Sequence, residues 1–171
     1  MAFVIRDDVK VYFEDHGTGP AILLSHGFSQ SSTMWREQIA DLQDRYRVIT
    51  WDMRGHGQSD YPEDPAAYTD AESVADMAAI LDACGERKAV IGGLSLGGCA
   101  SLLFHLKYPE RTAGLMLFDT GPGFRKDAAR DAWNDVAHKR AASFDKVGLD
   151  GLGDGPAAKI AGQRKATGLA H

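Results

Sequence analysis

One stretch of this sequence carries a pattern of residues that supports nucleophilic chemistry. Residues 93–97 are Gly-Leu-Ser-Leu-Gly, placed between a short apolar run and a long apolar helix pattern. The glycines suit a turn so tight that side chains at Gly93 and Gly97 would collide with neighbouring backbone. Such a turn lifts Ser95 clear of the strand and exposes its Oγ to a substrate. The pattern therefore predicts a nucleophilic serine at a strand-to-helix turn.

Other interpretations of this stretch fit less well. Gly-x-Ser-x-Gly by itself is also compatible with an ordinary glycine turn, and only the strand before it and the helix after it favour a nucleophile. A phosphate-binding loop that begins at Gly92 would need Lys and then Ser or Thr where Gly98 and Cys99 stand. A dinucleotide-binding fingerprint that begins there would need glycine in place of Leu94.

An acyl-transfer site also needs two hydrogen-bond donors for the oxyanion of the tetrahedral intermediate. The backbone N–H of Leu96 is one candidate, because it lies at the start of the predicted helix. The second is the N–H of Phe28, in a Ser-His-Gly-Phe segment that directly follows an apolar strand pattern. Gly27 allows the backbone to turn so that this N–H faces Ser95. His26 is interpreted as a scaffold residue that hydrogen-bonds within the loop, rather than as the catalytic base.

The remaining pattern predicts the elements that position these residues. Two short alternating runs at the N-terminus predict a β-hairpin, and strand and helix patterns then alternate along the chain. This order predicts an α/β fold with a mostly parallel sheet and helices on both faces. The helix at 96–108 is apolar almost all round, so we expect it to be buried. The predicted strands are 3–6, 9–14, 21–24, 46–51, 88–91 and 113–118, and the predicted helices are 34–42, 70–84, 96–108 and 128–144.

Composition excludes several classes of partner. The 171 residues carry a formal net charge of −5, which offers no electrostatic attraction for nucleic acid or an anionic membrane. No apolar run approaches the roughly 20 residues of a membrane span, and the N-terminus lacks a signal-peptide pattern, so we expect a cytoplasmic protein. The two cysteines, Cys84 and Cys99, are expected to be free thiols. No metal-ligand spacing is present, and no cofactor or metal is predicted.

Three motifs, in this order and spacing, resemble those of the α/β-hydrolase superfamily. They are Ser-His-Gly-Phe at 25–28, Asp-Met-Arg-Gly-His-Gly-Gln-Ser at 52–59, and the Gly-x-Ser-x-Gly stretch. The resemblance extends from about residue 3 to residue 118. It implies that the 52–59 loop lies near the oxyanion hole. Within this loop, Asp52 and Arg54 are expected to form a structural ion pair, and His56 is expected to be structural.

The same resemblance implies a helical cap after the sixth strand, then two further strands that carry a catalytic acid and a catalytic histidine. No such strand pattern follows in this sequence, so we expect residues 1–122 to form the hydrolase core and 123–171 a partial cap or a C-terminal tail. Asp119 is a candidate acid, because some members of the superfamily carry the acid after the sixth strand. His138 and His171 are the remaining candidates for a base, whereas His16 and His105 are expected to face their own neighbours.

Two functions stay open. The first is a serine hydrolase that cleaves a small ester, lactone or similar acyl substrate, since Ser95 argues against the branches that use an aspartate nucleophile. Its base and acid would then be missing from this chain. The second is a catalytically incomplete chain that acts as a binding or interaction module. Without further strands, the sixth strand would be an exposed sheet edge through which copies of the chain could associate.

Overall fold

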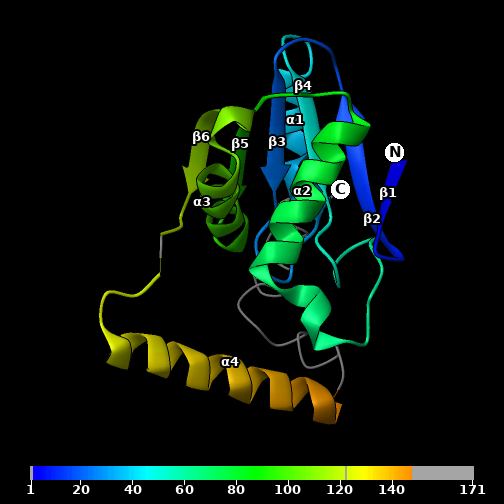
Figure 1. Ribbon diagram of the computed structural model, residues 1–171. Coiled ribbons are helices and arrows are strands. Elements are labelled where there is room, and N and C mark those ends of the chain that lie inside the picture. The colour runs from blue at the N-terminus through cyan, green and yellow to red at the C-terminus, as the bar shows by residue number, and fades with distance from the viewer. Residues whose placement is uncertain (1, 122, 148–171) are drawn as a thin grey trace, which may run out of the picture. The chain divides into compact units, whose positions relative to one another are not determined.

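The structure is a computed structural model that describes residues 2–121 and 123–147 (Figure 1). The chain divides into two units, Met1–Pro122 and Gly123–His171. The described elements of the first unit are a six-stranded sheet and the helices that pack on it. The second unit contributes one long helix, α4 (Asp127–Val147).

The sheet begins with an antiparallel hairpin and continues as parallel strands. In spatial order the strands are β1-β2-β4-β3-β5-β6, with antiparallel pairing of β1 with β2 and of β2 with β4, and parallel pairing beyond. Asp7 and Asp8 turn the hairpin with positive φ angles of 52° and 61°. The predicted hairpin and mostly parallel sheet are confirmed. The strands are β1 (Ala2–Arg6), β2 (Val9–His16), β3 (Ala21–Ser25), β4 (Arg47–Trp51), β5 (Ala89–Leu94) and β6 (Thr112–Phe118).

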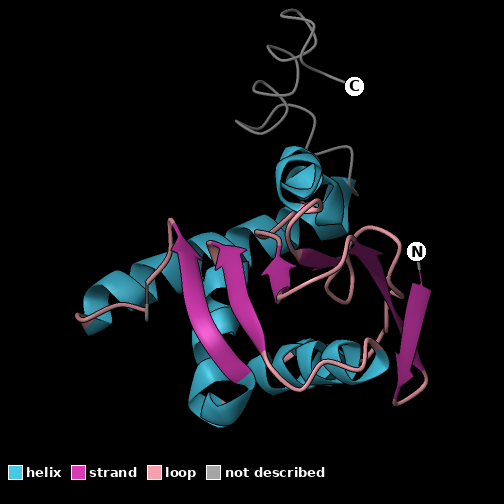
Figure 2. Ribbon diagram, turned by 90° about the horizontal axis from the view of Figure 1, so that it is seen from above, coloured by secondary structure: helices cyan, strands magenta, loops and turns pink. Residues whose placement is uncertain are grey.

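Helices cover both faces of this sheet, as the sequence pattern predicts. Figure 2 shows the strands as one twisted layer, with α2 and α3 on one side and α1 on the other. Local signals set the helix ends: the Thr69 hydroxyl accepts the Glu72 N–H at 3.3 Å to cap α2, and Pro109 follows α3. The α-helices of this unit are α1 (Arg36–Leu42), α2 (Asp70–Ala83) and α3 (Leu96–Lys107), with 3₁₀ turns at Ser32–Trp35, Pro65–Tyr68 and Pro109–Arg111.

The core consists of two apolar layers separated by the sheet. The larger layer joins α2 and α3 to the strands, and Met77, Leu81, Ile91 and Phe104 in it are fully buried. The smaller layer joins Trp35 and the short helix α1 to the opposite face of β3 and β4. Side chains of β3 enter both layers in alternation, which is why this strand is a continuous apolar run.

The expectation that the helix after Ser95 is buried all round is wrong. Leu106 of α3 is 76% exposed, and Leu103 is only half-buried. Within residues 2–121, α3 packs mainly against β5 and against its neighbours α2 and β6. Helix α3 therefore carries more apolar side chains than its described neighbours cover. The outward-facing turn of this helix remains a solvent-exposed apolar surface in this part of the chain.

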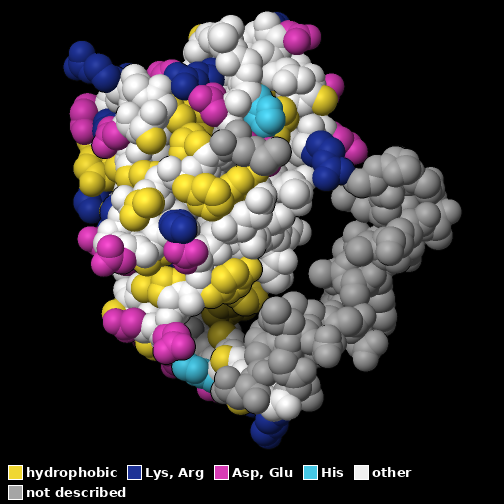
Figure 3. Space-filling view, turned by 90° about the vertical axis from the view of Figure 1, so that its right-hand side faces the viewer, with side chains coloured by type: hydrophobic (Ala, Val, Ile, Leu, Met, Phe, Trp, Pro, Cys, Tyr) yellow, Lys and Arg dark blue, Asp and Glu magenta, His cyan; other side chains and the backbone are white. Residues whose placement is uncertain are grey.

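Both edges of the described sheet are open and carry apolar side chains. Within residues 2–121, β6 pairs only with β5, and Leu115, Leu117 and Phe118 on it are 36–41% exposed. At the other edge, Phe3 and Ile5 of β1 are 51% and 66% exposed, and hydrophobic side chains lie among charged ones on that face (Figure 3).

Helix α4 is charged and amphipathic. Arg130 pairs with Asp127 at 3.0 Å, one turn apart, and the ring of Trp133 lies 5.9 Å from that of Phe124. Within the described part of the chain, Trp133 is 62% exposed and Val136 is 58% exposed. The helix predicted for 128–144 is confirmed with slightly wider bounds.

The contrast between α2 and α3 leads to a stability prediction. Leu81→Ala on α2 should lower the free energy of unfolding by about 2–5 kcal/mol, because this fully buried leucine would leave a cavity. Leu106→Ala on α3 is the matched control and should change it by less than about 0.5 kcal/mol. Urea unfolding followed by circular dichroism measures both, and equal losses would contradict the packing described above.

Candidate active site

Ser95 lies at the junction of β5 and α3, at the carboxyl end of the parallel strands. It is the N-terminal flanking residue of α3, and its φ of 51° and ψ of −110° are unusual for a residue with a side chain. Such a backbone conformation costs about 1–3 kcal/mol and persists only where the surroundings impose it. The side chain is exposed. The structure therefore has the strained and accessible serine that the motif predicts.

The glycines on either side of Ser95 allow three backbone segments to meet. A Cβ on Gly93 would overlap the backbone of Gly97, and a Cβ on Gly97 would overlap the carbonyl groups of Ser25 and His26. Residues 25–26 form the end of β3 and the start of the following loop. The turn at Ser95 is thus pressed directly against the end of β3, which only glycine permits.

The segment after β6 also contacts the turn. The Ser95 N–H donates to the Phe118 carbonyl at 3.0 Å, and the Thr120 hydroxyl donates to the Ser95 carbonyl at 2.7 Å. Asp119 lies between these two residues, is exposed, and has a positive φ of 46°. The candidate acid is therefore brought to the turn that carries Ser95. The role of Thr120 was missed, because a single threonine after a strand carries no sequence signal.

The two candidate oxyanion donors lie on segments that flank Ser95. Leu96 is the first residue of α3, where the backbone N–H groups have no partner inside the helix. An added Cβ on Gly27 would lie 3.8 Å from the Ser95 Cβ, which places the loop of Phe28 beside the serine. The Phe28 ring is 51% exposed. The structure thus brings together the segments of Ser95, Leu96 and Phe28.

His26 has both ring nitrogens engaged within the scaffold. It is completely buried; its Nδ1–H donates to the Gly27 carbonyl at 2.7 Å, and its Nε2 accepts the Met53 N–H at 3.0 Å. Burial lowers the pKa of His26 to about 4. A histidine used in this way joins the loop after β3 to the loop after β4, in agreement with the interpretation of it as a scaffold residue.

The expected ion pair between Asp52 and Arg54 is wrong. Asp52 accepts the backbone N–H groups of Ser32 at 2.6 Å and Gln58 at 2.9 Å, while Arg54 points away to Asp76 of α2. The resemblance implied this pair, but in the structure the Asp52 carboxylate orders the turn around it instead. Asp52 therefore shapes the 52–59 loop through backbone contacts.

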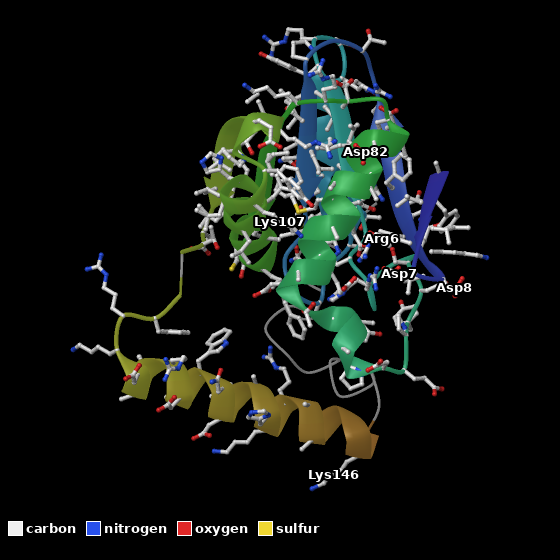
Figure 4. The ribbon with its side chains drawn as sticks, viewed as in Figure 1. Arg6, Asp7, Asp8, Asp82, Lys107 and Lys146 are labelled. Carbon is white, nitrogen blue, oxygen red and sulfur yellow. The ribbon has the colours of Figure 1, made fainter. Side chains whose placement is uncertain are left out.

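Asp76 is the centre of a buried charge cluster that was missed. Its carboxylate, fully buried, accepts Arg54 Nε and Nη2 at 2.7 and 2.9 Å and Arg6 Nε at 2.7 Å. Glu72, one turn earlier, also contacts Arg6, and this hydrogen bond lowers the pKa of Glu72. Figure 4 shows Arg6 at the end of β1 beside α2. The sequence signal that could have revealed this cluster is the pair of acidic residues, Glu72 and Asp76, which lie four positions apart on an otherwise mostly apolar helix.

Within residues 2–121, neither His16 nor His105 is positioned as a base. His16 contacts Glu14 at 3.0 Å, and His105 lies ten residues after Ser95, about 15 Å along the helix. Of the two candidates for a base, His138 belongs to α4 in the second unit, and His171 lies outside the described residues. Among residues 2–121, no side chain hydrogen-bonds to the Ser95 Oγ.

The described residues contain no group of three or more His, Cys, Asp or Glu side chains that could hold a metal ion.

Cys84 and Cys99 are free thiols, and burial raises the pKa of Cys84 to about 11. None of the helices in the described ranges has both the length and the apolar character required to cross a bilayer.

The buried cluster leads to a second stability prediction. Asp76→Asn should lower the free energy of unfolding by about 3 kcal/mol, because it removes the buried carboxylate shared by Arg6 and Arg54 and leaves only the more exposed Glu72 and Asp7 as countercharges. Asp82→Asn on the same helix is the matched control. Asp82 pairs with Arg111 but is 69% exposed, so its loss should cost less than about 1 kcal/mol. Denaturant unfolding at pH 7 measures both, and a cost for Asp76 as small as that for Asp82 would contradict a structural role of the cluster.

The neutral state of His26 predicts a dependence of stability on pH. Because its folded pKa of about 4 lies below the ordinary histidine pKa of 6.5, the unfolded chain binds a proton that the folded chain does not bind between these values. The stability due to His26 is complete above pH 6.5 and decreases as the pH falls toward 4, by roughly 3 kcal/mol. Unfolding measured from pH 7 to pH 4 should show a shallower slope for His26→Asn than for the unmodified chain, and identical slopes would rule out this contribution.

Comparison with known proteins agrees with the fold. The family model for the alpha/beta hydrolase fold matches residues 20–160. The chain is 34% identical over 135 residues to 3-oxoadipate enol-lactonase 1 of Acinetobacter baylyi, covering 79% of this chain and 46% of the relative. It is 36% identical over 109 residues to epoxide hydrolase 3 of Siraitia grosvenorii, covering 63% and 34%.

A solved structure shows the same architecture. The enol-lactonase from Burkholderia xenovorans LB400 superposes with a TM-score of 0.79 at 25% identity, covering 90% of this chain and 57% of that chain. The present chain spans less than half the length of the two curated relatives. With the family model matching most of its residues and the serine turn, the loop after β3 and the parallel sheet in place, the chain belongs to the α/β-hydrolase family.

Proposed function

We propose that this chain carries the nucleophile and oxyanion hole of a serine hydrolase that acts on a small ester, lactone or similar acyl substrate. The observation that carries the proposal is the strained, exposed conformation of Ser95 at the N-terminus of α3, held by two hydrogen bonds to residues 118 and 120 at the end of β6. Backbone strain at an accessible serine is typical of nucleophiles on strand-to-helix turns.

The reaction follows from the groups around Ser95. The Ser95 Oγ attacks the substrate carbonyl carbon and gives up its proton to a base, and the carbonyl oxygen takes the negative charge. The N–H groups of Phe28 and Leu96 hydrogen-bond to that oxygen. When the tetrahedral intermediate collapses, the carbonyl re-forms, the bond to the leaving alcohol breaks, and the proton passes to that alcohol. Water then hydrolyses the acyl-enzyme by the same steps.

In this proposal the base comes from outside residues 2–121, because both ring nitrogens of His26 are occupied and His105 is far along α3. Asp119 is suited to orient such a base. It is exposed at the carboxyl end of β6, and its two neighbours hydrogen-bond to the Ser95 backbone. A carboxylate there would hold a histidine in the tautomer needed to accept the serine proton.

The nucleophile decides between the reaction classes that the relatives represent. Family members include an epoxide hydrolase and an enol-lactonase. A serine forms an acyl-enzyme that water can hydrolyse, whereas the resemblance associates an aspartate nucleophile with epoxide opening. Ser95 therefore favours acyl substrates, and an enol-lactone is a reasonable first substrate to test.

A second candidate function rests on the open edge of β6. The exposed leucines and unpaired backbone groups of this strand favour association with another strand. If the chain lacks a base, it would act as a binding module or as a self-associating chain rather than as an enzyme.

Labelling with a fluorophosphonate tests the first candidate. If the chain itself supplies the base, Ser95→Ala should lower the labelling rate by at least about 10³-fold, because it removes the nucleophile. Ser73→Ala on α2, with its hydroxyl bonded to the Thr69 carbonyl at 3.4 Å, is the control and should label at the unmodified rate. Intact-mass spectrometry reports the modification, and p-nitrophenyl acetate hydrolysis reports turnover. If the unmodified chain labels no faster than Ser95→Ala, it is not an enzyme by itself and the second candidate is favoured.

A further inference from the structure

The loop beside Ser95 contains a turn in an unfavourable conformation. The Gln30 N–H donates to the Gly27 carbonyl at 3.2 Å, which closes a four-residue turn. Its third residue, Ser29, has a positive φ of 57°, whereas Phe28 is not among the residues with positive φ. These are the features of a type II turn, whose third position favours glycine or asparagine. A serine there is strained, so another interaction must select this turn.

His56 supplies that interaction. Its Nε2 lies 3.3 Å from the Ser29 backbone nitrogen, and its Nδ1 lies 3.1 Å from the Arg54 carbonyl oxygen. A carbonyl only accepts, so Nδ1 must carry a hydrogen, and a backbone N–H only donates, so Nε2 must be bare. The two contacts together require the neutral Nδ1–H tautomer of His56.

The position of the acceptor discriminates between turn types. Type I and type II turns differ by a flip of the peptide between the two central residues, here Phe28 and Ser29. In the type I form the Ser29 N–H would point away from His56, and the Phe28 carbonyl would face the bare Nε2. An acceptor at this place therefore stabilises type II and opposes type I.

Ring contacts hold His56 in this orientation. Its ring lies 5.9 Å from the Phe28 ring at an interplanar angle of 77°, and 5.0 Å from the ring of His26. His26 in turn donates to the Gly27 carbonyl, at the start of the same turn. The two histidines thus engage both ends of the segment that carries the Phe28 N–H.

We propose that His56 is a positioning residue: its neutral Nδ1–H tautomer accepts the Ser29 N–H, holds the 27–30 turn in the type II form and ties the loop that carries Phe28 to the 52–59 loop. The consequence of this tie for the oxyanion donor on the loop rests on the proposed function. The tautomer and the turn type do not, and they can be measured without any activity.

Nuclear magnetic resonance on the full chain tests the structural part. The ring nitrogens of His56 should show a protonated Nδ1 and a bare Nε2 near neutral pH. A strong nuclear Overhauser effect between the Phe28 Hα and the Ser29 amide hydrogen should report the type II turn. His56→Gln, which keeps an acceptor near the Nε2 position, should retain this signal, and His56→Phe, which keeps a ring without nitrogen, should lose it. A protonated Nε2, or an unchanged signal in His56→Phe, would overturn the proposal.

A second substitution separates positioning from a general loss of structure. Ser29→Gly relieves the strain at the third position, so the double variant Ser29→Gly/His56→Phe should recover the type II signal. Fluorophosphonate labelling of Ser95 should fall about tenfold in His56→Phe, which loses the tie to the 52–59 loop, and should be retained in His56→Gln, which keeps an acceptor there. Equal labelling of His56→Phe and the unmodified chain would overturn the link to the oxyanion donor. If the turn behaves as stated but Ser95 does not react in any variant, the proposed function fails and the assignment of the turn stands.

Discussion

The close approach of the Ser95 turn to the end of β3 is the constraint on which the rest of the site depends. A Cβ at Gly97 would overlap the carbonyl groups of Ser25 and His26, and a Cβ at Gly93 would overlap the backbone of Gly97. Because these segments touch through bare backbone, the loop after β3 runs directly beside the serine. The central position of β3, between β4 and β5, makes this contact possible.

The loop after β4 supports that contact through hydrogen bonds to the loop after β3 and to α2. Asp52 orders the loop through backbone N–H groups, Arg54 anchors it to Asp76 on α2, and the Met53 N–H donates to His26. Buried polar groups are costly unless they are paired, so the pairing of Asp52, Arg54 and His26 here indicates a rigid support. The strain at Ser95 is sustained by this surrounding structure rather than by its own neighbours in sequence.

Much of the fold could be predicted from local sequence patterns, and the predictions that proved wrong share one physical cause. The strands, their mostly parallel pairing and the helices α2, α3 and α4 were predictable, because periodicity and glycine or proline breaks act over a few residues. The partner of Arg54 was not, since Asp76 is 22 residues away and becomes a neighbour only when α2 packs on the sheet. The exposure of Leu106 was missed for the same reason, because burial depends on which elements cover a helix face.

The serine turn can be predicted from residues 93–97 alone, since local backbone geometry requires the glycines at 93 and 97 around Ser95. The family can also be predicted without coordinates, because three motifs at a characteristic spacing carry it. In contrast, the contacts of Phe118 and Thr120 with the turn, the pairing of Asp76 with Arg6 and Arg54, and the contact of His56 with the loop of Phe28 appear only in the folded chain. Hydrogen bonds and ion pairs act over a few ångströms, and the packing of distant segments sets those distances.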